Sequence, residues 1–139
     1  MKIPNQVHEV MTRDLVTVAP DDEITRVVSL LIKHDISGVP VVDRDGKLVG
    51  ILTERDCITI ALEAGYFDER GGIVAEYMST PVETVEADAG LVEVAERLRD
   101  SQYRRFPVLE EGRLVGLISR RDVLEVLNSG SWFGTAASS

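Results

Sequence analysis

The chain has 139 residues, 44% of them hydrophobic, and its 24 acidic and 15 basic residues give a formal net charge of −9. This length is enough for one good hydrophobic core, whereas half of it, near 60 residues, would be only marginally stable alone. The negative charge disfavours nucleic acid and anionic membrane as partners, because both repel an acidic surface.

The first half of the chain contains five predicted elements. A brief β segment at 16–18 precedes an amphipathic helix that Asp21 or Asp22 is expected to cap. The apolar residues of this helix recur with helical spacing and are Ile24, Val27, Val28, Leu31 and Ile32. The β-rich runs 39–43 and 47–52 flank Asp45-Gly46 and predict a hairpin. A second helix is expected over about 54–64.

The second half repeats this order of elements. A β segment at 83–85 precedes a helix whose apolar stripe is Leu91, Val94, Ala95 and Leu98. A hairpin is predicted from 106–109 and 113–118 around Glu111-Gly112, and a helix over 120–127 follows it. Each half therefore has the predicted order β-α-β-β-α.

The two halves are also related residue by residue. Val7, Met11 and Leu31 recur 67 positions later as Val74, Met78 and Leu98. After one deletion in the hairpin the offset becomes 66, and the segment 50–56 matches 116–122. Because a solenoid needs at least three stacked units, two copies favour one domain with a pseudo-twofold axis and two related clefts.

The repeat sets the expected domain boundaries. Residues 7–64 form the first motif, 65–73 a linker that contains Gly71 and Gly72, and 74–128 the second motif. Residues 129–139 are small and polar apart from Trp132 and Phe133, and they are predicted to be a flexible tail.

Two strings carry the most specific chemistry, Thr53-x-x-Asp56 and Ser119-x-x-Asp122. A hydroxyl at the end of a strand, followed three residues later by a carboxylate at the start of a helix, is typical of a capping box. Glu is the commoner partner in that box, yet the shorter Asp stands in both copies. The strings therefore leave a capping role and a ligand-binding role open.

The chain resembles a known family, the paired cystathionine-β-synthase (CBS) domains that form a Bateman module. The resemblance runs from about residue 7 to 127 and rests on the order of its motifs in both halves. These motifs are Met11-Thr12, the segment 16–18, Ser37-Gly38-Val39-Pro40 and the two hydroxyl-x-x-Asp strings. It implies an α/β (α+β) fold in which two pseudo-twofold related β-α-β-β-α CBS motifs pack into one stand-alone regulatory module.

The resemblance also implies a ligand. In the family the aspartate accepts hydrogen bonds from both ribose hydroxyls of an adenosine, and a carboxylate suits a diol because it has two acceptor oxygens and no donor. The Ser or Thr contacts ribose or phosphate, and the segment before the proline lines the base pocket. The implied ligand-binding residues are Thr12, Val16, Ile36, Ser37, Gly38, Val39, Pro40, Thr53, Asp56, Val82, Tyr103, Arg104, Arg105, Phe106, Pro107, Ser119, Arg121 and Asp122. Core packing is the alternative for the side chains of Val39 and Phe106.

The two halves differ at the base segment. Ile36-Ser37-Gly38 is small and neutral, whereas Tyr103-Arg104-Arg105 carries two cations and a ring. With Arg121 and Arg120 nearby, Arg104 suggests a basic cluster, because a guanidinium is well shaped for phosphate. A solvated surface pair is the alternative. We therefore expect the second-repeat cleft to bind the more highly phosphorylated ligand, and the first cleft to bind weakly or to take a less charged one.

The expected function is non-catalytic. AMP, ADP, ATP or a related adenosyl compound is expected to bind between the two motifs and to change the shape of a homodimer, whose contact is expected through the apolar second helices. An unidentified protein would respond to this change. Two alternatives remain open, an interaction module with vestigial clefts and a nucleotide hydrolase, although no catalytic residues stand out.

The sequence gives little support for a membrane span, a secretion signal or a metal site. No apolar run approaches the roughly 20 residues of a membrane span, and the first residues lack the apolar region of a signal peptide, so a cytoplasmic location is expected. One cysteine and two scattered histidines argue against a metal site, and no cofactor is expected to be required. Cys57 aligns with Val123 and is predicted to be a small buried hydrophobe.

Overall fold

A computed structural model describes residues 4–63 and 72–129, which form two compact units. The Asp56 unit comprises residues 16–63 and 72–82, and the Asp122 unit comprises residues 4–15 and 83–129. These boundaries differ from those of the sequence repeats. Residues 7–15 of the first repeat belong to the Asp122 unit, and residues 74–82 of the second belong to the Asp56 unit. Each unit therefore contains residues of both repeats.

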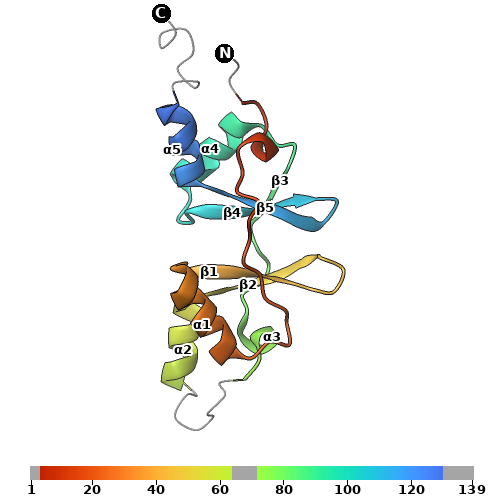
Figure 1. Cartoon of the computed structure of the whole chain (residues 1–139), viewed down its shortest axis with the longest axis vertical. Helices are drawn as coiled ribbons and strands as arrows, with labels where there is room; N and C mark the ends of the chain where they lie inside the picture. The colour runs from red at the N-terminus through yellow and green to blue at the C-terminus, as the bar shows by residue number, and fades with distance from the viewer. Residues whose placement is uncertain (1–3, 64–71, 130–139) are drawn as a thin grey trace, which may run out of the picture. The chain divides into compact units, whose positions relative to one another are not determined.

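The Asp56 unit is built on one hairpin. It contains the helix α1 (Ile24–His34), the strands β1 (Gly38–Val42) and β2 (Leu48–Thr53), and the helices α2 (Glu54–Glu63) and α3 (Val74–Tyr77) (Figure 1). β1 and β2 are antiparallel, and Gly38 pairs with Thr53. The predicted β segment at 16–18 is reduced to one parallel bridge, between Val18 and Val41.

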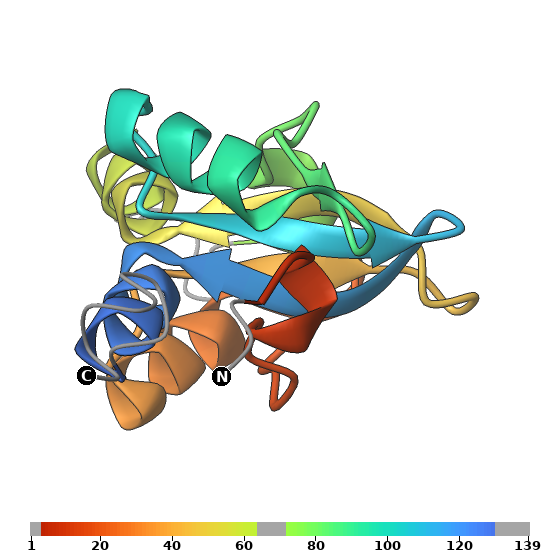
Figure 2. The ribbon, with the colours of Figure 1, turned by 90° about the horizontal axis from the view of Figure 1, so that it is seen from above.

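The Asp122 unit has a sheet of three strands in the order β3-β4-β5. Its elements are a short 3-10 helix η1 (Val7–Glu9), the strands β3 (Val85–Glu86), β4 (Arg105–Glu110) and β5 (Arg113–Ser119), and the helices α4 (Leu91–Asp100) and α5 (Arg120–Asn128). α4 and α5 lie on one face of β4 and β5, and Figure 2 looks onto that face. The predicted order β-α-β-β-α is confirmed in this unit, and the mixture of helices and sheets is an α+β fold.

Both hairpins turn where the sequence predicts. Between β4 and β5, Glu111 and Gly112 have φ angles of 52° and 80°. Two successive residues with positive φ form the turn that matches the twist of paired strands, and glycine adopts this conformation without steric cost. Gly46, with a φ of 82°, has the corresponding role between β1 and β2.

Each unit has its own core, and the helical stripes supply much of it. In the Asp56 unit Ile24, Val27 and Leu31 of α1 are buried, and in the Asp122 unit Leu91, Val94 and Leu98 of α4 are buried. Two members of the predicted apolar stripe, Val28 and Ile32, are not buried. Val28 is only partly covered and Ile32 is 75% exposed, because the buried face of α1 is narrower than the apolar stripe.

The predicted cap of α1 was also wrong. Its N-cap residue is Glu23, which makes no side-chain capping bond. The Asp22 carboxylate instead accepts a hydrogen bond from the Ala19 amide at 2.8 Å and forms an ion pair with Arg26 at 2.9 Å. Asp22 therefore stabilises the turn that precedes α1, and its ion pair holds the side chain of Arg26 in the first turn of the helix.

In the Asp56 unit, the segment from the second repeat crosses β2 at Gly50. In the Asp122 unit, the segment from the first repeat crosses β5 at Gly116. A Cβ atom on Gly116 would lie 2.5 Å from Met11 Sδ, and one on Gly50 would lie 2.6 Å from Met78 Sδ. The neighbouring residues bind the strands through their backbones: Thr12 pairs with Leu117, and Ser79 pairs with Ile51. This close approach brings the hydroxyls of Thr12 and Ser79 near the start of α5 and α2.

None of the helices within residues 4–63 and 72–129 is long and apolar enough to cross a membrane. Most of the predicted linker, and nearly all of the predicted tail with Trp132 and Phe133, lie outside the described residues.

Candidate functional site

The Asp122 carboxylate lies at the start of α5 and accepts three hydrogen bonds. Asp122 Oδ2 accepts from the Ser119 amide at 2.9 Å and from Ser119 Oγ at 3.0 Å, and the Asp122 amide donates to Ser119 Oγ at 3.1 Å. Asp122 Oδ1 accepts from Thr12 Oγ1 at 3.0 Å. Only 9% of Asp122 is exposed. The capping box predicted for this string is confirmed.

Asp56 has the matching position at the start of α2, with weaker contacts. Asp56 Oδ2 accepts from the Thr53 amide at 2.9 Å, and the Asp56 amide donates to Thr53 Oγ1 at 3.2 Å. Ser79 Oγ lies 3.4 Å from Oδ1 and 3.5 Å from Oδ2, at the limit of a hydrogen bond. Asp56 is half-buried, so this residue is more exposed than Asp122.

The segments predicted to line the base pocket lie beside these carboxylates. The Glu54 amide donates to the Ser37 carbonyl at 2.8 Å, and the Arg120 amide donates to the Arg104 carbonyl at 3.0 Å. Strand pairing also places Gly38 opposite Thr53 and Arg105 opposite Ser119. In each unit the structure thus brings the segment before the proline together with the hydroxyl-x-x-Asp string.

The side chains of Val39 and Phe106 are fully buried in the cores of their units, and Pro40 and Pro107 are buried too. The guanidinium of Arg97 lies 4.7 Å from the centre of the Phe106 ring, which adds a cation–π contact. The prediction that the side chains of Val39 and Phe106 present an apolar surface to a base is therefore corrected, because core packing leaves no exposed surface. Their backbones are buried as well, in the pairing of Val39 with Leu52 and of Phe106 with Ile118.

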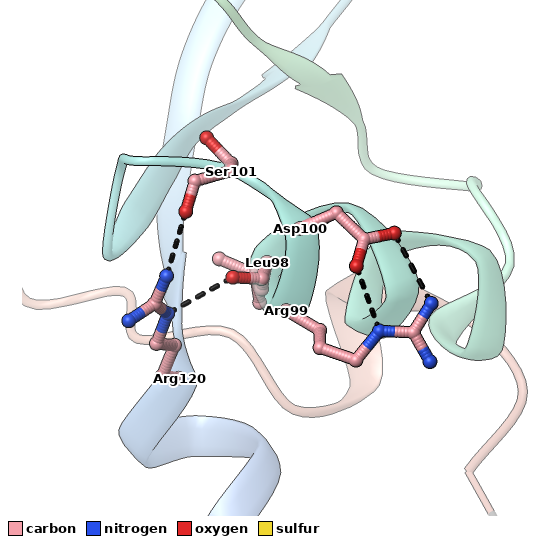
Figure 3. Close-up of polar contacts among 5 residues, drawn as sticks. All are labelled: Leu98, Arg99, Asp100, Ser101 and Arg120. Carbon is pink, nitrogen blue, oxygen red and sulfur yellow. Dashed lines mark hydrogen bonds and ion pairs between the residues drawn. The ribbon is translucent and has the colours of Figure 1, made fainter.

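One residue of the predicted basic cluster, Arg120, makes hydrogen bonds within the protein instead. Arg120 Nε donates to the Leu98 carbonyl at 2.9 Å, and the other end of its guanidinium donates to the Ser101 carbonyl at 2.7 Å (Figure 3). Arg120 therefore satisfies carbonyl groups at the C-terminal end of α4, which lack partners within the helix. Arg104 and Arg121 are exposed and Arg105 is half-buried.

Four further residues of the predicted site, Val16, Ile36, Val82 and Tyr103, have other surroundings. Val16 and Ile36 pack against the core of the Asp56 unit, and Val82 is half-buried in the same unit. Tyr103 lines an open cleft of about 540 Å³ with acidic residues of α4 and with Arg97. The described contacts of Tyr103 thus place its ring at the end of α4.

The sequence analysis missed one neighbour of the Asp56 carboxylate, Ser79. Its hydroxyl approaches Asp56 as that of Thr12 approaches Asp122. The repeat offset contains the necessary signal, because Ser79 stands 67 positions after Thr12 and both are hydroxyl residues that follow a methionine.

Cys57 follows Asp56 on α2 and is partly buried against the core of the Asp56 unit, so it is less buried than predicted. Burial, followed by the charges of Asp56 and Glu54, raises the pKa of its thiol. Within residues 4–63 and 72–129, no three His, Cys, Asp or Glu side chains gather in a way that could hold a metal ion.

Each of the two α+β units has a hydroxyl-x-x-Asp string where the second strand of its hairpin runs into a helix, at α2 and at α5. This repetition defines a class of two-unit modules. The family model described as "CBS domain" matches the chain twice, at residues 7–63 and 74–129. The chain belongs to the CBS domain family.

Relatives of known sequence include proteins of similar and of much greater length. The CBS domain-containing protein YhcV of Bacillus subtilis is 32% identical over 120 residues, which span 86% of this chain and 83% of that protein. An inosine-5'-monophosphate dehydrogenase of Methanocaldococcus jannaschii is 33% identical over 135 residues. This match spans 90% of the chain but only 26% of the dehydrogenase, so the chain is similar to a minor part of that enzyme.

Solved structures share the fold across both units. CBSX2 of Arabidopsis thaliana in complex with AMP has a TM-score of 0.79 at 25% identity, covering 91% of this chain and 98% of that chain. The CBS domain pair of MJ0100 in complex with 5'-methylthioadenosine and S-adenosyl-L-methionine has a TM-score of 0.73 at 27% identity, covering 91% and 99%. Both of these similar proteins bind compounds that contain adenosine.

Proposed function

We propose that this chain is a non-catalytic regulatory module that binds an adenosine-containing ligand such as AMP, ADP or ATP. The observation that carries this proposal is the repeated placement of a carboxylate at the start of a helix, beside the backbone of a segment that precedes proline. The adenosyl ligands of CBSX2 and MJ0100 support the same class of ligand.

Each group of residues has a proposed role. Asp56 and Asp122 accept hydrogen bonds from the two ribose hydroxyls, and Thr53 and Ser119 contact the ribose or phosphate. The backbone of residues 36–38 and 103–105, which are not fully buried, offers hydrogen-bonding groups to the base. Arg104, Arg105 and Arg121 are cations in the Asp122 unit that could bind phosphate groups, because a guanidinium donates two parallel hydrogen bonds to such oxygens.

Signalling through a homodimer forms part of the proposal. Ile58 and Leu62 of α2 and Leu124 of α5 have most of their surface exposed, with Leu62 at 78%. Apolar side chains gathered on one helix favour contact with another apolar surface. A ligand would change the arrangement of such a dimer only to the extent that it binds one arrangement more tightly than another. An unidentified regulated protein would recognise the favoured arrangement.

One observation favours the alternative, an interaction module with vestigial sites. Asp122 already uses three of the roughly four acceptor positions of its carboxylate for contacts within the protein. A carboxylate retained only for such contacts would hold the unit together without a ligand.

Isothermal titration calorimetry distinguishes the two functions. The full chain is titrated with AMP, ATP, NAD and S-adenosylmethionine, and the titrations are repeated on Asp56→Ala and Asp122→Ala. Binding of one compound in the micromolar range, weakened by at least one substitution, supports the sensor. No heat from any of the four compounds, with a folded protein, would favour the interaction module.

A further inference from the structure

The two carboxylates differ in how many acceptor positions they have left. Each carboxylate has about four lone-pair positions on its two oxygens, and a ribose diol needs two of them. At Asp122, three hydrogen bonds of 3.0 Å or less occupy both oxygens. At Asp56, one short bond of 2.9 Å occupies Oδ2, and the Ser79 hydroxyl stands 3.4 Å from Oδ1.

The capping serines and threonines add to this difference. Ser119 Oγ donates to the Asp122 carboxylate while it accepts from the Asp122 amide. Thr53 Oγ1 accepts from the Asp56 amide, but within the described part of the chain it makes no bond to the Asp56 carboxylate. Asp56 thus has three positions free of short bonds, whereas Asp122 has one.

The exposure of the two residues also makes Asp56 the more accessible acceptor for a ribose. Asp122 is 9% exposed, whereas Asp56 is half-buried. The oxygen that a diol would need at Asp122 is also the one that binds Thr12, a residue of the crossing segment 7–15. A diol at Asp122 must therefore displace the Thr12 hydroxyl, whereas a diol at Asp56 displaces only a long contact with Ser79.

From these contacts we infer that Asp56 is the ribose acceptor of higher affinity, and that the Thr12–Asp122 hydrogen bond is a clasp that a nucleotide must open to occupy the second site. This inference rests on the proposed function and orders its two sites. It also reverses the order suggested by the arginines of the second repeat. Occupation of Asp122 would release one contact of the N-terminal segment, so the second binding event has a structural consequence that the first lacks.

The test is a titration of ¹⁵N-labelled full chain with AMP, followed by the backbone amide signals of Thr53, Asp56, Ser119 and Asp122. These amides take part in the two capping boxes and report on each carboxylate separately. The signals of Thr53 and Asp56 are expected to move at an AMP concentration about 10-fold lower than those of Ser119 and Asp122, since one displaced hydrogen bond to a charged group corresponds to roughly that factor.

Matched variants test the clasp. Thr12→Val removes the hydroxyl with little change in volume, and it is expected to bring the two AMP midpoints closer by strengthening binding at Asp122. Ser79→Ala is the control and is expected to leave both midpoints within about 2-fold, because the Ser79 contact is long. Asp56→Asn keeps one capping oxygen and is expected to weaken the first event about 10-fold or more.

The outcomes separate the inference from the proposed function. Signals at Ser119 and Asp122 that move first, or a Thr12→Val variant that binds AMP more weakly at Asp122, would overturn the order of sites and leave an adenosine-binding module. Failure of all four signals to move with AMP, ATP, NAD or S-adenosylmethionine would overturn both.

Discussion

Thr12 and Asp122 are 110 residues apart in the sequence, yet Thr12 Oγ1 donates a hydrogen bond of 3.0 Å to Asp122 Oδ1. The bond joins a segment of the first repeat to the helix that ends the second, within one compact unit. The bond can form because Met11 packs directly on Gly116, where the side chain of a larger residue would collide with Met11 and Thr12.

Substitution of Gly116 by alanine should therefore destabilise the protein. The added Cβ would lie 2.5 Å from Met11 Sδ and 3.0 Å from the Thr12 carbonyl oxygen, so both side chain and backbone must move. We expect Gly116→Ala to lower the free energy of unfolding by about 1–3 kcal/mol, as other overpacking substitutions do. Urea unfolding followed by circular dichroism measures it. Gly90→Ser is the control, because a Cβ at Gly90 meets no atom within 4 Å; equal stability of the two variants would contradict the described crossing.

Substitution of two neighbouring arginines, Arg120 and Arg121, should have unequal effects on the free energy of unfolding. Both residues are exposed, but Arg120 also donates to the Leu98 and Ser101 carbonyls. Arg120→Ala should reduce the free energy of unfolding by about 1–3 kcal/mol, because two hydrogen bonds from a charged group are lost. Arg121→Ala should change it by less than about 0.5 kcal/mol. Thermal unfolding of both variants provides the comparison, and a larger loss for Arg121→Ala would show that Arg120 does not hold the end of α4.

These arginines show what the sequence could and could not predict. The apolar spacing and the Gly-containing turns were sufficient for the four longer helices and both hairpins, because those depend on near neighbours in the chain, but the short helices η1 and α3 were not predicted. The role of Arg120 depends on a helix end 22 residues away, which no local pattern reveals. The exposure of Ile32 likewise depends on how wide a face the sheet covers.

The exchange of segments could not be predicted for a further reason. Met11 and Met78 are alike, and so are Gly50 and Gly116, so the sequence fits either pairing of methionine with glycine equally well. Only the structure distinguishes them, with Met11 at Gly116 and Met78 at Gly50. For the site, the repeat identified the carboxylates, while the difference in their hydrogen bonding depends on contacts across these exchanged segments.

The Cys57 thiol should make stability depend on pH. Burial, followed by the charges of Asp56 and Glu54, raises its pKa above the ordinary value of 9.0. Because the folded state holds this proton more tightly than the unfolded chain, the contribution to stability is fully present below pH 9.0 and is lost as the pH rises through the folded-state pKa. Urea midpoints should therefore fall more steeply above pH 9.0 for the wild type than for Cys57→Val, which copies the residue at Val123. Parallel curves for the two proteins would count against the raised pKa.

Arg104 should discriminate between ligands by phosphate content. Its side chain is exposed, so Arg104→Ala should leave the free energy of unfolding within about 0.5 kcal/mol of the wild type. We expect the variant to bind ATP about 10-fold more weakly in the second binding event, because a charge-assisted hydrogen bond to phosphate is lost. Adenosine, which has no phosphate, is the matched control ligand and should bind unchanged. Calorimetric titrations with both ligands decide the matter, and unchanged ATP affinity would remove the phosphate role of Arg104.

The most direct test of the account compares AMP with 2'-deoxy-AMP on the wild-type chain by isothermal titration calorimetry. If Asp56 and Asp122 accept both ribose hydroxyls, loss of one hydroxyl should weaken binding about 10-fold or more, and Asp56→Asn should remove most of this difference. Equal affinities for the two nucleotides would show that the carboxylates do not recognise the ribose, and would contradict the central claim.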